Sequence, residues 1–144
     1  MRGMLLDKYI SMRRMNEMVS SSKILPVSSN IVIRGNFWKI LNRYVLGQSM
    51  FDGVNLQAYM KLYAAGYIIT SGDVLEISVY NRTTRQFMIS TPLQITDTDS
   101  QIVSSDNIQI PDTDSLIWIV AKLNGTNYGI IDTVQLNLFQ QMEV

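Results

Sequence analysis

Apolar and polar residues alternate along most of the chain from residue 24 onward, with the two-residue period of a strand that buries one face. The longest alternating run covers residues 54–64, and shorter ones cover 75–80 and 134–138. Residues 116–121 are apolar at every position, which is typical of a central strand covered on both sides. Further short strands are predicted at residues 31–34, 37–45, 85–90, 92–96, 101–104 and 107–110.

Residues that favour turns separate these runs. Asp52-Gly53, Ser71-Gly72-Asp73 and Asn124-Gly125 each stand between two predicted strands, and residues 81–84 predict a hairpin that joins 74–80 to 85–90. Eight to ten short strands at this spacing predict a sandwich, jelly roll or barrel. We therefore expect a mainly β fold, an antiparallel β-sandwich of the jelly-roll kind. Segment 37–45 is ambiguous, because its apolar residues also fit the spacing of a helix.

Residues 1–22 follow a different period, with apolar residues three or four positions apart, which predicts a helix with one apolar face. Ser20-Ser21-Ser22 then predicts a linker, which divides the chain into an N-terminal helical arm at 1–22 and a sandwich domain at 23–144. Methionine adapts to irregular surfaces, so the arm either docks on a neighbour, packs on its own domain or orders only on assembly. The expected interface residues are Leu5, Tyr9, Met12, Arg13, Arg14 and Met15.

The composition excludes several kinds of chemistry. Among 144 residues there is no cysteine and no histidine, which removes disulfides, zinc–thiolate sites and the commonest general base. The motifs of a phosphate-binding loop, a dinucleotide-binding loop and a nucleophile elbow are all missing. We therefore predict no enzymatic activity, no catalytic residue, no metal and no cofactor. No apolar run reaches the ~20 residues of a membrane helix, and no secretory signal is evident, so we expect a soluble protein.

Charge is distributed unevenly along the chain. Residues 1–72 hold nine Lys/Arg and three Asp/Glu, a net +6, whereas residues 73–144 hold three and nine, a net −6. One interpretation is a charge dipole that favours head-to-tail contact between copies. The other is that the two halves interleave in one sandwich and the charges mix. The only basic pair is Arg13-Arg14, which argues against nucleic-acid binding.

A short acidic motif occurs twice. The stretch QITDTDSQI at 94–102 is echoed by QIPDTDSLI at 109–117. If the chain turns at residues 104–107, both acidic loops lie at the same end of the sandwich. Their aspartates offer oxygen ligands for calcium, but neither copy has the spacing of a known calcium loop, and stabilisation of turns by Asp and Thr side chains is the simpler explanation. The acidic-loop residues are Asp97, Asp99, Asp112 and Asp114.

Aromatic residues give a second candidate site. Tyr59 and Tyr63 fall on the polar face of the 54–64 strand, so they are expected to point outward and to stack on a sugar ring or to pair with neighbouring strands. Other members of this predicted platform are Trp38, Tyr67, Tyr80 and Tyr128. Trp118 lies in the most apolar run and is predicted to be core. Glu76 is expected to face solvent beside Lys61 or Arg85.

The stretch from Ser115 to Gln140, SLIWIVAKLNGTNYGIIDTVQLNLFQ, combines an apolar strand, an Asn-Gly turn and an alternating strand. It resembles the end of small jelly-roll proteins of virions, with tailed-phage head decoration and head-to-tail components as the nearest comparison. This resemblance implies a non-enzymatic structural protein of the virion, whose partners are copies of itself and other virion proteins. The alternative from the aromatic residues is a carbohydrate-binding β-sandwich module.

Overall fold

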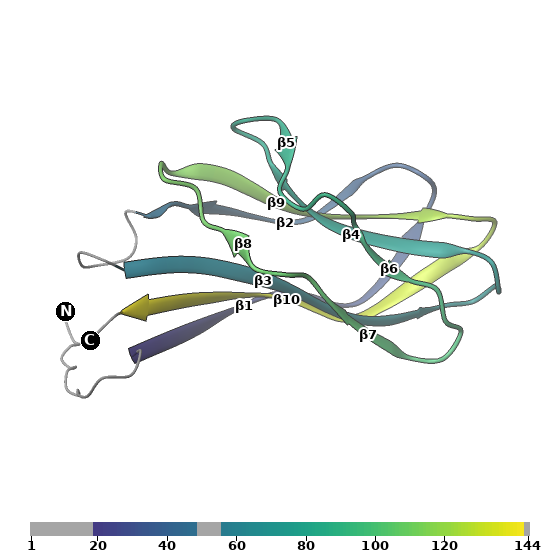
Figure 1. The fold of residues 1–144 in the computed structure, drawn as a ribbon. Helices are drawn as coiled ribbons and strands as arrows, with labels where there is room; N and C mark the ends of the chain where they lie inside the picture. The colour runs from purple at the N-terminus through teal and green to yellow at the C-terminus, as the bar shows by residue number, and fades with distance from the viewer. Residues whose placement is uncertain (1–18, 49–55, 143–144) are drawn as a thin grey trace.

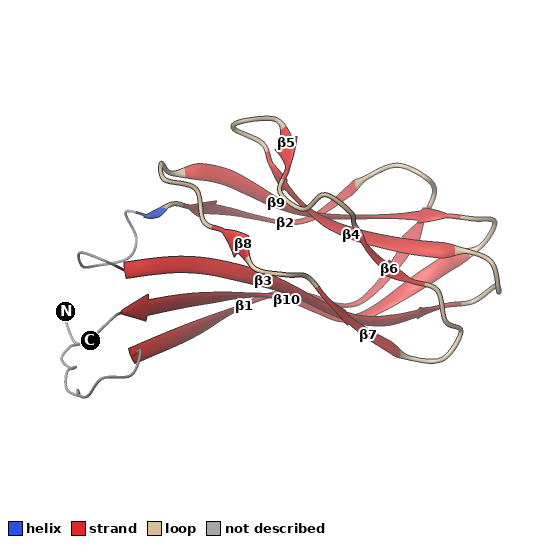
Figure 2. Cartoon of the chain, viewed as in Figure 1, coloured by secondary structure: helices blue, strands red, loops and turns tan. Residues whose placement is uncertain are grey.

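The computed structural model describes residues 19–48 and 56–142, and these form strands and loops with one short helical turn at Gln48 (Figures 1 and 2). The ten strands confirm the predicted mainly β fold. Their bounds are β1 (Val19–Arg34), β2 (Lys39–Leu46), β3 (Leu56–Ile68), β4 (Val74–Asn81), β5 (Gln86–Phe87), β6 (Leu93–Ile95), β7 (Gln101–Ser104), β8 (Ile108–Gln109), β9 (Ser115–Asn124) and β10 (Tyr128–Met142). None of the helices in the described part of the chain is long and apolar enough to span a membrane.

The strands form two antiparallel sheets packed face to face (Figure 1). One sheet has the order β1-β10-β3-β7, with β8 also paired to β3, and the other has the order β2-β9-β4-β5, with β6 also paired to β4. The pairing is nested: β1 pairs with β10, β2 with β9, β3 with β8 and β4 with β6. The chain changes sheet at each step from β1 to β4 and from β8 to β10. A long antiparallel ribbon wrapped in this way is a jelly roll, as the strand pattern predicted.

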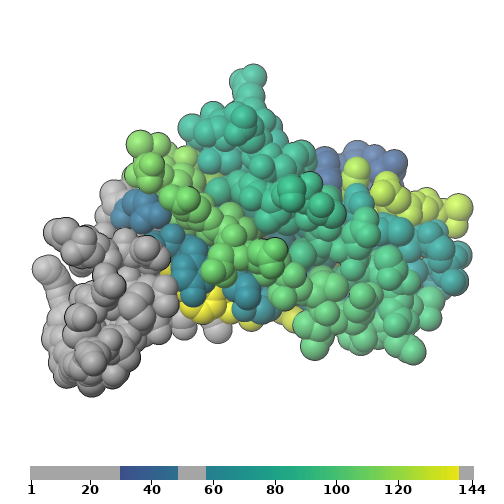
Figure 3. All heavy atoms as spheres, viewed as in Figure 1, coloured from purple at the N-terminus to yellow at the C-terminus, as the bar shows by residue number. Residues whose placement is uncertain are grey.

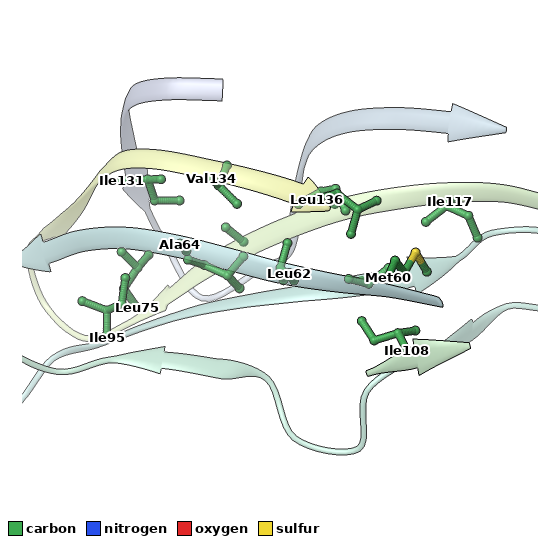
Figure 4. Packing of buried hydrophobic residues seen from close by; sticks show 14 of the residues in the cluster. Met60, Leu62, Ala64, Leu75, Ile95, Ile108, Ile117, Ile131, Val134 and Leu136 are labelled. Carbon is green, nitrogen blue, oxygen red and sulfur yellow. The ribbon is translucent and has the colours of Figure 1, made fainter. Parts of the chain in front are cut away.

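The core lies between the sheets and is made by one face of each central strand. Leu75, Ile77 and Val79 of β4 are buried on this face, as are Ile117 and Ile119 of β9. Figure 4 shows that residues of β3, β10 and β8 complete the same cluster. The two-residue alternation of the sequence therefore becomes two facing apolar layers, and their burial is the main stabilising contribution to the fold.

The strand predictions hold over most of the described chain. Most of segment 37–45, which also fitted a helix, lies in β2, and residues 81–84 close the predicted hairpin, with Tyr80 opposite Phe87. The linker predicted at 20–22 is wrong, because Ser20-Ser21-Ser22 lies within β1 and pairs with residues 139–141 of β10. β1 is an edge strand, and it accommodates Pro26 next to a register shift. Residues 1–18 of the predicted arm lie outside the described residues.

β7 and β8 are two pieces of one interrupted edge strand. Both run antiparallel to β3, with Ser104 opposite Tyr63 and Ile108 opposite Met60. The chain therefore continues in one direction from 101 to 109, instead of turning back at 104–107 as predicted. Ser105 bridges the interruption: its N–H donates to Leu62 O and its Oγ accepts from Leu62 N–H, both at 2.9 Å.

Replacing Ser105 by alanine is expected to lower the free energy of unfolding by about 1–2 kcal/mol, because the buried Leu62 N–H loses its acceptor. Chemical denaturation followed by circular dichroism measures this change. Ser104→Ala is the matched control, since Ser104 is exposed, and it should change stability by less than about 0.5 kcal/mol. Equal effects of the two substitutions would show that the Ser105 hydroxyl contributes nothing to the edge strand.

Candidate functional site

The aromatic residues predicted as one platform lie on opposite faces of the sandwich. Tyr59, Tyr63 and Tyr67 belong to β3 and alternate with buried residues, so they lie on the outer face of the first sheet. Trp38 lies beside Phe87, and Tyr80 beside Trp118, on the outer face of the second sheet. The six residues therefore do not form one stacking surface.

On the first sheet, the rings of Tyr59 and Phe139 are stacked across β3 and β10, with centroids 5.0 Å apart and planes 19° from parallel. Lys61 Nζ lies 5.9 Å from the centroid of the Tyr63 ring. Tyr59 and Tyr63 are both partly buried. Tyr59 thus makes the kind of cross-strand contact that the sequence offered as the alternative to sugar stacking, and Tyr63 contacts a residue of its own strand.

On the second sheet, four side chains form a row across four strands. The register places Arg43 of β2 opposite Trp118 of β9, Trp118 opposite Tyr80 of β4, and Tyr80 opposite Phe87 of β5. The guanidinium of Arg43 lies 5.6 Å from the Trp118 ring centroid. The Trp118 and Tyr80 centroids are 6.0 Å apart, and those of Tyr80 and Phe87 are 5.0 Å apart. We call these four residues the aromatic row.

The prediction that Trp118 belongs to the core is wrong. Its neighbours Ile117 and Ile119 point between the sheets, so the alternation of β9 turns Trp118 to the outer face, where it is half-buried. A second guanidinium, that of Arg82, lies 5.7 Å from its ring centroid. Arginine groups beside an indole ring are stabilised by the electron-rich ring face. The indole Nε1 is buried and has no hydrogen-bond partner among the described residues.

Trp38 extends the aromatic row. Its ring lies 5.3 Å from Phe87 by centroids, and Lys122 Nζ lies 4.7 Å from its centroid. Lys122 in turn lies 3.6 Å from Glu76 Oε1, and Gln94 Nε2 donates to Glu76 Oε2 at 3.2 Å. The expected partners of Glu76 were therefore wrong: its cation is Lys122, which lies directly opposite on β9.

The outer face of the second sheet is strongly cationic. Arg43, Arg82 and Lys122 lie on it, and Glu76 is the carboxylate that balances one of them. The sequence offered no signal for this cluster, because its residues come from segments far apart in the chain. Only the register across β2, β9 and β4 brings them together.

The two acidic loops lie at opposite ends of the sandwich. Asp97 O accepts from Ile68 N–H at the end of β3, whereas Pro111 O, next to Asp112, accepts from Gln48 N–H beside the end of β2. The prediction of a shared end is wrong, because β7 and β8 carry the chain from one end to the other. All four predicted aspartates are exposed, and Asp97 Oδ1 accepts from Asp99 N–H at 2.9 Å, as a turn-stabilising residue does. The described residues hold no group of three Asp, Glu, His or Cys that could bind a metal ion.

One titratable group in the described chain departs clearly from its ordinary value. Burial of Tyr44 raises its pKa, since a phenolate would be poorly solvated there. Asn42 Nδ2 donates to Tyr44 Oη at 3.2 Å. The predicted arm residues Leu5, Tyr9, Met12, Arg13, Arg14 and Met15 lie outside the described residues.

Comparison with known proteins identifies the architecture. No protein-family model matches the chain, and no curated protein sequence matches it. Among solved structures, the T13 particle of infectious bursal disease virus matches with a TM-score of 0.53, at 9% identity over 87% of this chain. The VP2 subviral particle of the same virus matches with a TM-score of 0.53, at 9% identity over 86% of this chain. This chain has the fold of a virus-particle jelly roll.

The likeness to these particle proteins extends to the fold alone. This chain spans 36% and 33% of the two viral chains, about a third of each. A CBM36-1 domain of a multidomain xylanase from a hindgut metagenome of Trinervitermes trinervoides also matches, at 7% identity over 82% of this chain and 96% of that one. Its TM-score of 0.47 is too low to indicate a ligand.

Proposed function

We propose that this chain is a non-enzymatic structural component of a virus particle, which acts by contacting copies of itself and other particle proteins. The two-sheet fold carries this proposal, because two structures of virus-particle proteins resemble it with TM-scores of 0.53. Within this role, the sequence resemblance favours a tailed-phage head decoration or head-to-tail component. The aromatic residues predicted to bind sugar lie on two opposite faces of the sandwich, so they give less support to the carbohydrate-binding alternative.

The part of the predicted arm that precedes β1, residues 1–18, is proposed as one contact to a neighbour. Its apolar residues would cover a surface of the next subunit, and Arg13 and Arg14 would pair with acidic loops such as 97–99 or 112–114 on that subunit. Those loops suit this role because all four of their aspartates are exposed. Surface charges of opposite sign steer such contacts and set their orientation.

Sedimentation velocity at several concentrations tests the proposal. The full chain is expected to form a discrete oligomer or particle much heavier than the 16.4 kDa monomer. A chain shortened by residues 1–18 retains every described strand, and we expect it to sediment as a folded monomer that keeps the circular-dichroism signal of its strands.

A point-variant comparison separates the apolar face of the arm from its length. Serine in place of Leu5, Tyr9, Met12 and Met15 should abolish assembly, whereas serine in place of Asp7 and Glu17 should not. Normal assembly of the shortened chain would refute the role of the arm. A full-length chain that stays monomeric at every concentration would contradict self-assembly itself.

A further inference from the structure

The two open sides of the sandwich carry opposite charge. β1 and β2 are the edge strands on one side. The described residues 30–48, which contain the end of β1 and all of β2, hold three cations, Arg34, Lys39 and Arg43, and no carboxylate. The described part of the chain gives none of these cations an ion-pair partner. We call this the basic side.

Strands β5 to β8 form the other side, which faces the viewer in Figure 3 as teal and green segments. Residues 86–109, which contain these four strands, hold three aspartates, Asp97, Asp99 and Asp106, and not one Lys or Arg. Asp99 and Asp106, which flank β7, are both exposed. We call this the acidic side.

The nested topology explains why the charges of the two halves do not mix. β1 and β2 pair with β10 and β9, so each has a partner on one flank and an open edge on the other. The middle of the chain, β5 to β8, pairs inward with β4 and β3 and forms the opposite edges. The early, basic half and the later, acidic half therefore supply opposite sides of the same sandwich.

Both sides also expose apolar residues on unpaired edges. Ile102 of β7 is 79% exposed, and Val45 of β2 and Phe37 beside it are 63% and 62% exposed. Open strand edges with exposed aliphatic side chains are ready surfaces for another chain. The acidic side is also recessed: two hollows of about 440 and 470 Å³ open on either side of Met88.

We infer that the basic side of one copy docks on the acidic side of the next. Copies then lie beside one another, and each contact joins two different surfaces in a head-to-tail arrangement. This inference rests on the proposed role in assembly and names the surfaces that perform it. Lys39 and Arg43 face Asp99 and Asp106 of the neighbour, and Phe37 and Val45 enter the recessed side. Such a contact uses two different surfaces, so it builds a closed ring if the rotation between copies closes and a filament if it does not.

Charge reversal on each side, followed by mixing, tests this contact. Variant one carries Lys39→Glu and Arg43→Glu, and variant two carries Asp99→Arg and Asp106→Arg. Each variant alone presents like charges at every contact, so its dissociation constant is expected to rise about tenfold or more in sedimentation velocity at low salt. An equal mixture should assemble again. The reversed side of variant one is now negative and meets the reversed side of variant two, which is now positive, and the two unreversed sides meet as in the wild type. Assembly of the wild type should weaken as salt rises.

Lys61→Glu is the control, a charge reversal on the outer face of the first sheet and outside the proposed contact, and it should assemble like the wild type. Circular dichroism checks that each variant is folded, and Lys39→Gln with Arg43→Gln and Asp99→Asn with Asp106→Asn replace any variant that is not. If the wild type assembles and the reversed variants assemble equally well, the docking surfaces are wrong while the assembly role stands. If the mixture fails to recover, the head-to-tail pairing is wrong, and a monomeric wild type overturns both proposals.

Discussion

Replacing Ile119 by alanine is expected to lower the free energy of unfolding by about 2–5 kcal/mol, the range for large-to-small changes in protein cores. Ile119 is 0% exposed and belongs to the cluster between the sheets. Its strand, β9, is held by β2 on one side and β4 on the other, so the backbone has little freedom to close the cavity. The loss of apolar contact therefore remains uncompensated.

Ile102→Ala is the matched control, because it makes the same chemical change at a side chain that is 79% exposed. It should alter stability by less than about 0.5 kcal/mol. Urea denaturation at high salt and low protein concentration, where the monomer is measured, compares the two variants. A loss below about 1 kcal/mol for Ile119→Ala would show that the two sheets pack more loosely around β9 than these contacts require.

Strands with strict alternation could be predicted from the sequence, because which of their side chains are buried depends only on the order of apolar and polar residues within the strand. In β4, Leu75 and Ile77 are buried in the core while Tyr80 points outward, as their spacing requires. The extent of β10, from Tyr128 to Met142, was underestimated. Residues 128–133 and 139–142 at its two ends break the alternation of apolar and polar positions, and they are strand because β1 and β3 pair with them on both sides.

The orientation of Trp118 could not be predicted, because both faces of its strand are apolar. Ile117 and Ile119 on one face and Leu116 and Trp118 on the other are equivalent as hydrophobic patterns. Pairing with Arg43 and Tyr80, which are distant in sequence, identifies the outer face. The aromatic row was missed for this reason.

The placement of the acidic loops failed on a related point. Residues 104–107 have the composition of a turn, but their pairing with β3 makes them an interruption in a strand. A turn reverses the direction of the chain and an interruption does not. The two interpretations therefore place Asp112 at opposite ends of the sandwich. The contact that decides between them, Ser105 with Leu62, joins residues 43 positions apart. No local pattern contains that information.

The charge asymmetry had two interpretations, and strand order decides between them. Had β1 and β2 paired with the middle of the chain, Arg43 and Asp106 would lie on neighbouring strands and their charges would offset each other. Because β2 pairs with β9 instead, they lie on opposite sides. The uneven distribution of charge along the sequence thus gives two oppositely charged sides only because of the strand topology.

Replacing Gly66 by alanine is expected to destabilise the protein by about 3 kcal/mol or more, the upper end of the range for overpacked positions. A Cβ at this position would lie only 2.2 Å from Ile130 O and 3.2 Å from Ile131 Cα, far inside van der Waals contact. Both atoms belong to the backbone of β10, so no change of side-chain rotamer relieves the clash. The position also coincides with the register shift between Ile131 and Thr133, where β3 and β10 approach closely. Thermal and urea unfolding should both show the loss.

Gly72→Ala separates this steric effect from the backbone preference of glycine. Gly72 has a φ of +98°, and beyond its own chain neighbours no atom lies within 4 Å of the place a Cβ would occupy, so alanine there meets strain without any clash. We expect a loss of about 1 kcal/mol, well below that at Gly66. Similar losses at both positions would mean that β10 moves aside at little energetic cost. The central pairing of the first sheet would then be too compliant to hold the two charged sides in fixed positions, and the side-by-side contact between copies would lose its rigid base.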